Sequence, residues 1–202
     1  MSLRLSGGRR LQSPPGDRAR PTPSRVRLAV MNMLAPRLAG CRWLDLCCGS
    51  AVMACEALQR GAAHVVALEQ DRRIAQVAKA NLQSVALGLG EGAGQWQLHN
   101  QEVLQWLRAA SRPAATSTEQ PFDLIYCDPP YGAGLYGPIA AALATGRWLQ
   151  PQGLLLMECG SSQVPPTPEG WVLESERRYG STTVLLLSCP AGCRGGTGSR
   201  QP

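Results

Sequence analysis

The sequence predicts an α/β fold, with a mostly parallel seven-stranded sheet, helices on both faces and an antiparallel hairpin at the C-terminal end. The first observation is a regular alternation of short apolar runs with helical stretches from Arg42 to Cys159. The second is the pair of strand-like runs that follows, separated by a short turn with no room for a helix. The third is size, because 202 residues with 44% hydrophobic content suffice for one domain with a proper core.

Each element of this alternation follows from hydrophobic periodicity and from turn residues. Ile74, Val77, Ala78 and Leu82 recur at helical spacing, whereas the strands are short apolar runs bounded by polar residues or glycine. In order, we predict strand 42–46, helix 51–60, strand 64–68, helix 71–84, strand 95–99, helix 102–110, strand 122–127, helix 136–146, strand 153–159, and hairpin strands 171–178 and 182–188. The polar stretch 111–120 is expected to be a mobile surface loop.

Positive charge is concentrated in the first 42 residues. They hold nine arginines against one acid, Asp17, a formal +8 within a chain whose net charge is +6. Basic arms of this kind commonly bind nucleic-acid phosphates or anionic membranes, although a solvated disordered tail has the same composition. An arginine-rich start is also typical of an organelle transit peptide that is removed before folding.

The second half of this arm has the pattern of a helix rather than of a removed leader. Ser24 is the predicted N-cap, and Val26, Val30, Met33 and Leu34 then fall on one helical face. We therefore expect part of the arm to be folded and retained.

The cysteines and the absence of long apolar runs indicate a reducing, cytoplasmic setting. No apolar run approaches the roughly 20 residues of a membrane helix. Most of the eight cysteines lie inside apolar runs, where a free thiol behaves as a small hydrophobe. Cys189 and Cys193 have a spacing that metal sites use, but no histidine is near, so we expect no metal.

A distinctive tetrapeptide follows the predicted strand 122–127: Asp128, Pro129, Pro130 and Tyr131. Two consecutive prolines hold the backbone rigid and extended, so that a carboxylate, a carbonyl and an aromatic ring point to one spot. The alternatives are a turn acid bonded to its own backbone and a ring that packs on the sheet edge. We predict that these four residues are catalytic.

The turn after the first strand is made of small residues, so its backbone can lie close to a bound ligand. Glu69 ends the second strand, where an acid commonly accepts hydrogen bonds from ribose hydroxyls. The turn has one glycine, Gly49, instead of the three that a pyrophosphate site needs, and this favours S-adenosylmethionine, which has no phosphate. Alternatively, Gly49 only forms a tight turn and Glu69 is a surface acid before a helix.

Polar residues after the third strand complete the predicted cofactor site, where an adenine amine is to be held. Glu102 is the expected acceptor there, although it equally suits the N-terminus of a helix. We predict cofactor binding by Asp45, Cys47, Gly49, Ser50, Glu69, Gln70, Gln101, Glu102 and Asp128.

Taken together, these residues resemble a Rossmann-like class I methyltransferase, and more closely the bacterial 16S ribosomal RNA guanine-N2 methyltransferases of the RsmD type. The resemblance spans residues 4 to 188, and its specific parts are 4–8, 20–27, 32–36, 45–49, 56–62, 128–131 and Glu158. The arm decides the family, because Asp-Pro-Pro-Tyr occurs in many amino-methyltransferases. The family usually carries Gly-Ser-Gly where this chain has Gly49, Ser50 and Ala51, so a positive φ at Ala51 would put cofactor affinity in doubt.

The resemblance implies methyl transfer from S-adenosylmethionine to the N2 amine of a guanine in 16S ribosomal RNA. The partner would be this RNA or the assembling small ribosomal subunit, bound by a monomer without membrane contact. Residues 1–38 would form a basic RNA-binding extension with one helix, 39–189 the methyltransferase domain and 190–202 a disordered tail. The candidates for holding the RNA backbone are Arg4, Arg9, Arg10, Arg20, Arg25 and Arg27.

Three alternatives remain open. A DNA or RNA adenine amino-methyltransferase shares the tetrapeptide, but the DNA enzymes typically carry a target-recognition region for which no insertion here is large enough. A protein glutamine methyltransferase usually has asparagine where this chain has Asp128. A non-catalytic RNA-binding or ribosome-assembly protein would explain the altered cofactor turn.

Overall fold

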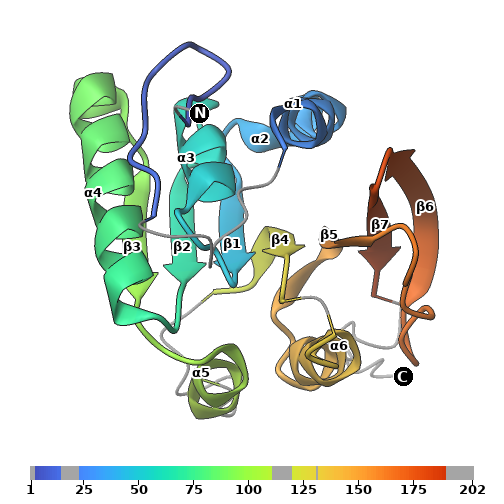
Figure 1. Ribbon diagram of the computed structural model, residues 1–202. Coiled ribbons are helices and arrows are strands. Elements are labelled where there is room, and N and C mark those ends of the chain that lie inside the picture. The colour runs from blue at the N-terminus through green and yellow to red at the C-terminus, as the bar shows by residue number, and fades with distance from the viewer. Residues whose placement is uncertain (1–2, 15–22, 111–119, 131, 190–202) are drawn as a thin grey trace, which may run out of the picture.

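The computed structural model describes residues 3–14, 23–110, 120–130 and 132–189. Within these residues, seven strands form one sheet in the order β3-β2-β1-β4-β5-β7-β6 (Figure 1). Neighbours from β3 to β5 pair in parallel, whereas β7 pairs antiparallel with both β5 and β6. The predicted fold class is confirmed, including the terminal hairpin.

The observed elements follow the predicted order closely. The strands are β1 (Arg42–Leu46), β2 (His64–Leu68), β3 (Gln95–His99), β4 (Phe122–Cys127), β5 (Leu149–Gly160), β6 (Val172–Tyr179) and β7 (Thr182–Ser188). The helices are α1 (Ser24–Met33), α2 (Ala35–Leu38), α3 (Val52–Gln59), α4 (Arg72–Leu89), α5 (Val103–Ala110) and α6 (Tyr136–Thr145), with a 3-10 turn, η1 (Gly90–Gly92), after α4.

Two elements are longer than predicted. Helix α4 continues to Leu89, past the predicted end at residue 84, because Val85 extends its buried face. Strand β5 begins at Leu149, where it pairs with Phe122, instead of at Gly153. A Cβ at Gly153 would lie 2.6 Å from the Leu149 side chain, so this glycine is required by packing inside the strand.

The start of α1 also differs from its prediction. Pro23 occupies the N-cap position, Ser24 is the first helical residue, and no side chain caps the helix. The Pro23 carbonyl accepts the first intrahelical bond from the Arg27 N–H.

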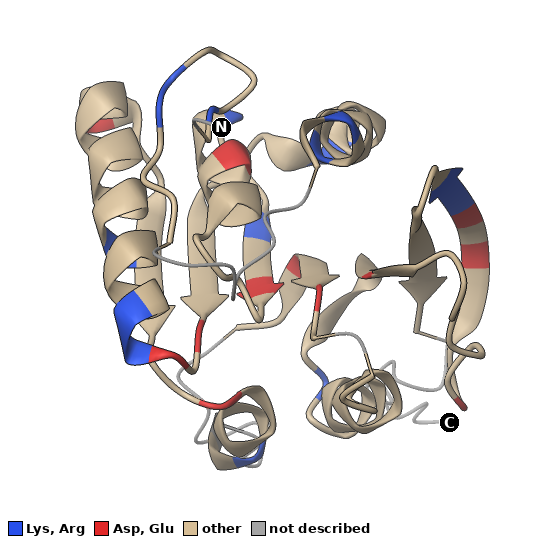
Figure 2. Cartoon of the chain, in the orientation of Figure 1, with Lys and Arg blue, Asp and Glu red and all other residues tan. Residues whose placement is uncertain are grey.

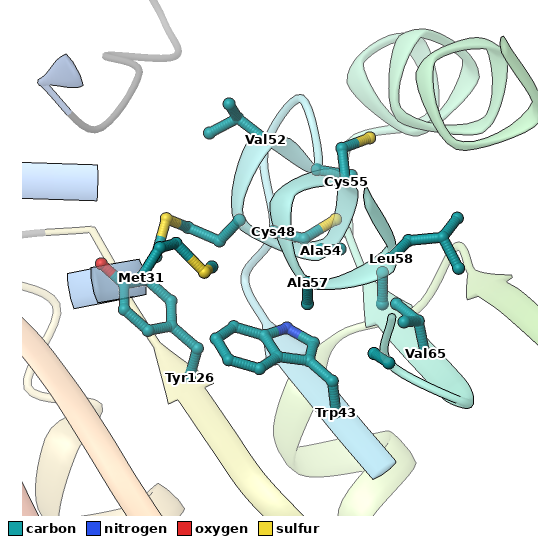
Figure 3. Packing of buried hydrophobic residues seen from close by; sticks show 14 of the residues in the cluster. Met31, Trp43, Cys48, Val52, Ala54, Cys55, Ala57, Leu58, Val65 and Tyr126 are labelled. Carbon is teal, nitrogen blue, oxygen red and sulfur yellow. The ribbon is translucent and has the colours of Figure 1, made fainter. Parts of the chain in front are cut away.

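Helices cover both faces of the sheet (Figure 1). Helices α1 to α4 pack on one face, and α5 and α6 pack on the other. Successive strand residues alternate between these cores, so that Trp43 packs with the first group and Leu44 with the second. Trp43 stacks on Tyr126 with ring centroids 6.0 Å apart beneath α3 (Figure 3).

The N-terminal arm belongs to the same core. Residues 3–11 form a small hairpin in which Arg4 bridges Arg10 and the Leu5 N–H donates to the Arg9 carbonyl. Leu3, Leu5 and Leu11 are buried in the cluster that contains Trp43. The described part of the arm thus supplies side chains to the core on this face of the sheet. Residues 15–22, 111–119 and 190–202 lie outside the described residues, and they include the predicted tail and all but the last residue of the predicted loop 111–120.

Among the helices that the structure describes, none combines the length and apolar character that crossing a membrane requires.

Candidate active site

The two predicted halves of the site meet where the strand order reverses. β1 and β4 are neighbours, and Leu46 pairs with Cys127, so the cofactor turn and the Asp128 tetrapeptide leave adjacent strands at the same edge. Ligands of open α/β sheets bind at this switch point. One pocket of about 650 Å³ opens there. Its lining includes Asp45, Cys47, Gly49, Ser50, Glu69, Gln70, Gln101, Glu102, Asp128, Pro129 and Pro130.

The cofactor turn is made of left-handed backbone. Cys47, Gly49 and Ala51 have φ values of 60°, 54° and 59°. Only glycine adopts this conformation without cost, so the altered third position of the turn carries strain at a fully buried residue. The positive φ at Ala51, which puts cofactor affinity in doubt, is thus present.

Asp45 fastens the turn to the helix that follows. Its Oδ2 accepts the Ala54 N–H at 2.9 Å, which caps the start of α3 where no neighbouring side chain does. Burial, and to a lesser extent Glu69 and Glu158, raises the pKa of Asp45 to about 8. Asp45 therefore has both a structural role and a place in the pocket wall.

Glu69 links the first and second strand ends. Its Oε2 accepts the Gly49 N–H at 2.9 Å and its Oε1 accepts the Asp71 N–H at 2.8 Å. Burial raises the pKa of Glu69, and these backbone donors oppose the shift. Asn100 adds support from the end of β3, because its amide donates to the carbonyls of Glu69 and Gln70. The predicted ribose acceptor is held rigidly at the pocket wall.

Glu102 lies at the N-terminus of α5. This is the second of the two roles that the sequence allowed, beside that of an acceptor for the adenine amine. Its two carboxylate oxygens accept the N–H groups of Leu104 at 2.9 Å and Gln105 at 2.7 Å. These are the bonds of a helix N-cap. Glu102 and Gln101 still line the pocket, and their contact with a cofactor stays a prediction.

Asp128 continues the line of β4 beyond the last paired residue. Its N–H donates to the Leu46 carbonyl at 3.5 Å, and Pro129 is buried beside it. Burial, and then the charges of Glu158 and Asp45, raise the pKa of Asp128 to about 8. Tyr131, the fourth predicted catalytic residue, lies outside the described residues.

Sequence reasoning missed a buried pair next to Asp128. The Tyr126 hydroxyl donates to the Glu158 carboxylate, and the Tyr136 hydroxyl donates to the Glu158 carbonyl at 2.8 Å. Both Tyr126 and Glu158 line the pocket, as does Thr182. Glu158 belongs to the parts of the sequence that resemble the family, but its pairing with Tyr126 and its place beside Asp128 were not predicted.

The pocket is strongly acidic. Asp45, Glu69, Asp128 and Glu158 all line it, whereas the described lining contains no lysine or arginine. Figure 2 shows acidic positions at the neighbouring ends of strands β1, β2 and β4. Each of these four carboxyl groups has a raised pKa, with burial as the largest cause. Removing like charges from water side by side is unfavourable, so this pocket favours a cationic ligand. Across the described ranges, no group of three or more His, Cys, Asp or Glu side chains has the arrangement of a metal site.

The predicted RNA-binding arginines differ in their surroundings. Arg4, Arg10 and Arg25 are exposed, Arg9 is half-buried with its guanidinium donating to the Ser84 carbonyl at 3.2 Å, and Arg20 lies outside the described residues. Arg27 conflicts with its prediction. It is buried, and it donates from Nε to Glu56 at 3.1 Å and from its other end to the Arg4 carbonyl. Its guanidinium therefore faces the buried Glu56 carboxylate and not a phosphate.

The cysteines at positions 41, 47, 48, 55, 127 and 159 are free. Burial raises the pKa of Cys47 to about 12, so this pocket thiol is not a reactive thiolate.

The fold and this acidic switch-point pocket define a Rossmann-like methyltransferase fold, which comparison with solved structures supports. The yhhF protein of Escherichia coli superposes with a TM-score of 0.74 at 28% identity, covering 94% of this chain and 98% of that one. The rRNA methyltransferase aviRa of Streptomyces viridochromogenes, at 18% identity, has the same fold with a TM-score of 0.64 over 87% of this chain and 88% of its own.

The sequence comparisons identify the family. The model named Conserved hypothetical protein 95 matches residues 5–188, and the chain belongs to this family. Ribosomal RNA small subunit methyltransferase D of Haemophilus influenzae is 32% identical over 180 residues, which cover 89% of this chain and 88% of that protein. The protein of the same name from Escherichia coli is 29% identical over 89% of this chain and 84% of its own length. The resemblance to RsmD-type methyltransferases is confirmed.

Proposed function

We propose that this protein is a ribosomal RNA methyltransferase that transfers a methyl group from S-adenosylmethionine to the N2 amine of a guanine in 16S ribosomal RNA. Its substrate is this RNA, naked or in the assembling small subunit. The observation that carries the proposal is the joining of the cofactor turn and the Asp128 tetrapeptide in one acidic pocket. The names of the relatives support RNA of the small ribosomal subunit as the substrate class.

The residues of the pocket fit S-adenosylmethionine. The volume of about 650 Å³ is in the range of ligand sites, and the acidic lining suits a molecule that carries a sulfonium and an ammonium group. The turn from Cys47 to Ala51 presents backbone to the methionine end, and Glu69 has lone pairs left for ribose hydroxyls. When bound, the cofactor supplies an electrophilic methyl group.

The protein's part in the reaction is to expose the lone pair of a poor nucleophile. The N2 lone pair of guanine is delocalised into the ring. The Asp128 carboxylate and the Pro129 carbonyl each accept one N–H bond of the amine, which favours tetrahedral geometry at nitrogen. These acceptors are preorganised, because strand β4 and two prolines fix them. Holding the amine in line with the methyl group supplies much of the remaining acceleration.

RNA binding is assigned to the arm and to Tyr131. The exposed Arg4, Arg10 and Arg25 contact phosphates, which position the RNA without reading its sequence. Arg20 is retained from the sequence prediction, and Arg9 is a weaker candidate because its guanidinium already bonds Ser84. Tyr131 stacks on the base that leaves the helix, a contact worth roughly 1–3 kcal/mol in single-strand binding proteins.

Methyl incorporation tests the proposal. Purified protein, labelled S-adenosylmethionine and either naked 16S RNA or small subunits from cells lacking this enzyme are combined, and the modified base is mapped. We expect label in N2-methylguanine at a single site, and none with Asp128→Ala. Asp128 is one of several predicted cofactor contacts, so the cofactor affinity of this variant by calorimetry should stay similar to that of the parent. Label in N6-methyladenine would instead identify an adenine amino-methyltransferase. RNA binding without any transfer would identify a non-catalytic assembly protein and overturn the proposal.

A further inference from the structure

Two carboxylates stand next to each other on adjacent strands at the reacting end of the pocket. In the parallel pair of β4 and β5, Tyr126 lies opposite Leu156 and Cys127 opposite Met157. Continuing this register by one residue places Asp128 opposite Glu158, on the sheet face where Tyr126 also lies. Neighbouring strands are about 4.8 Å apart. Both acids line the pocket, and the charge of Glu158 contributes to the raised pKa of Asp128.

The Glu158 side chain is held in place, but one of its carboxylate oxygens has no hydrogen-bond partner among the described residues. Its side chain is only 2% exposed, and one of its oxygens, Oε2, accepts the hydroxyl of Tyr126. Tyr126 is itself held by its stack on Trp43. Within the described part of the chain, Oε1 has no hydrogen-bond partner, although the residue lines the pocket. On a residue that lines a pocket, a carboxylate oxygen without a protein partner can accept a hydrogen bond from a ligand.

The proposed substrate offers donors in the matching arrangement. The Watson–Crick edge of guanine presents the N2 amine and, directly beside it, the N1–H group. Both are donors, whereas adenine presents its amine beside N1, which is an acceptor. Asp128 is assigned to the amine, which leaves Glu158 beside the position of the neighbouring ring nitrogen.

We propose that Glu158 is a specificity-determining residue whose carboxylate accepts the N1–H of the target guanine while Asp128 accepts its N2 amine. This inference rests on the proposed function. The raised pKa values of these two acids describe the ligand-free pocket. The two donors of a bound guanine favour the charged form of both carboxyl groups, which then act as acceptors. On a base with an acceptor at N1, the Glu158 oxygen instead faces another lone pair in a water-poor site. A site built to bond a donor rejects the analogue that lacks it much more strongly than an apolar pocket does.

Base analogues at the mapped site test this role without altering the protein. Synthetic RNA, reconstituted into subunits if only subunits are methylated, carries guanine, 2-aminopurine or 6-thioguanine. 2-Aminopurine keeps the N2 amine but has an acceptor at N1, and 6-thioguanine keeps both donors and alters position 6. We expect kcat/KM for 2-aminopurine to be about tenfold to a hundredfold below that for guanine, the range of one hydrogen bond to a charged group. 6-Thioguanine should stay within about threefold of guanine.

The variant Glu158→Gln then links this selectivity to the residue. Its amide can accept from or donate to N1, so the ratio of guanine to 2-aminopurine rates should fall by about tenfold relative to the parent enzyme. Tyr126→Phe removes the hydroxyl that orients Glu158 and should lower the same ratio by a smaller factor. Calorimetric affinity for S-adenosylmethionine and thermal unfolding report the integrity of both variants.

The outcomes separate this inference from the proposed function. If no guanine RNA is methylated, the proposed function fails. If guanine is methylated and the parent enzyme uses 2-aminopurine equally well, the role of Glu158 is wrong, whatever the variants do. If folded Glu158→Gln keeps the parent's ratio of guanine to 2-aminopurine rates, the proposed role of Glu158 is also wrong. An acid with only a structural role would change the rates for both bases together.

Discussion

The Nε atom of Arg27 lies 3.1 Å from Oε1 of Glu56, and both side chains are buried between helices α1 and α3. The same carboxylate accepts the backbone N–H and the hydroxyl of Ser6, at 2.8 Å and 2.7 Å. Arg60 lies 3.6 Å from its other oxygen. One acid on α3 thus ties down both the N-terminal hairpin and the first helix, and it does so without any RNA.

Replacing Arg27 by alanine should therefore affect stability first. Its removal leaves the buried Glu56 with Ser6 and the more distant, less buried Arg60 only, and we expect the free energy of unfolding to fall by roughly 3 kcal/mol. The matched control is Arg25→Ala, an exposed arginine on the same helix, which should change stability by less than about 0.5 kcal/mol. Urea unfolding measures both. Equal small effects would show that the Arg27–Glu56 pair does not anchor the arm.

The strain at Ala51 is measurable by comparison with a second buried alanine. Ala51→Gly loses a methyl group worth about 0.8 kcal/mol but relieves about 1 kcal/mol of left-handed strain, so stability should hardly change. Ala54→Gly loses a similar methyl from helix α3 and adds about 1 kcal/mol of helix cost, nearly 2 kcal/mol in all. The difference between the variants, by urea unfolding, isolates the strain. A loss for Ala51→Gly as large as that for Ala54→Gly would argue against it.

The raised pKa of Asp128 predicts how the stability of the ligand-free protein depends on pH. The folded state keeps a proton between the ordinary pKa of 3.8 and the folded value of about 8, whereas the unfolded chain releases it. Because the folded state binds more protons in this window, the free energy of unfolding should decrease as pH rises through it. Asp128→Asn should flatten this decrease and be more stable than the parent near pH 8. Urea unfolding at pH 5.5 and pH 8 measures the slope, and an identical slope in the variant would contradict the assignment.

Phosphate contacts by the exposed arginines of the arm should contribute to the salt dependence of RNA binding. If Arg25 contacts one phosphate, Arg25→Gln should weaken RNA binding and lower the slope of log K against log salt by about 1. Arg108→Gln, which removes an exposed arginine from α5 on the opposite face of the sheet, is the control and should keep the parent slope. Filter binding over a salt series provides the measurement. Equal slopes for all three proteins would remove Arg25 from the RNA interface.

The sequence by itself determined the fold class and the two halves of the candidate site. Strand and helix periods are local properties, so the alternation, the glycine turn and the acid before two prolines could be recognised without coordinates. The strand ends that carry Asp45 and Asp128 followed from the α/β pattern, because ligands of such sheets gather at the carboxyl ends of parallel strands. The predicted ends of the elements were less accurate; strand β5, for example, begins at Leu149 and not at Gly153.

Only the tertiary structure decided which charged groups face the pocket, the core or the solvent. Arg25 and Arg27 are two positions apart and look alike in sequence, but the helix turns one outward and the other onto Glu56. The sequence marks Glu158 as part of the family resemblance, but only the register of β4 and β5 sets it beside Asp128. Burial and pairing across distant segments fix these roles, because the cost of a charge depends on the groups that the fold brings around it.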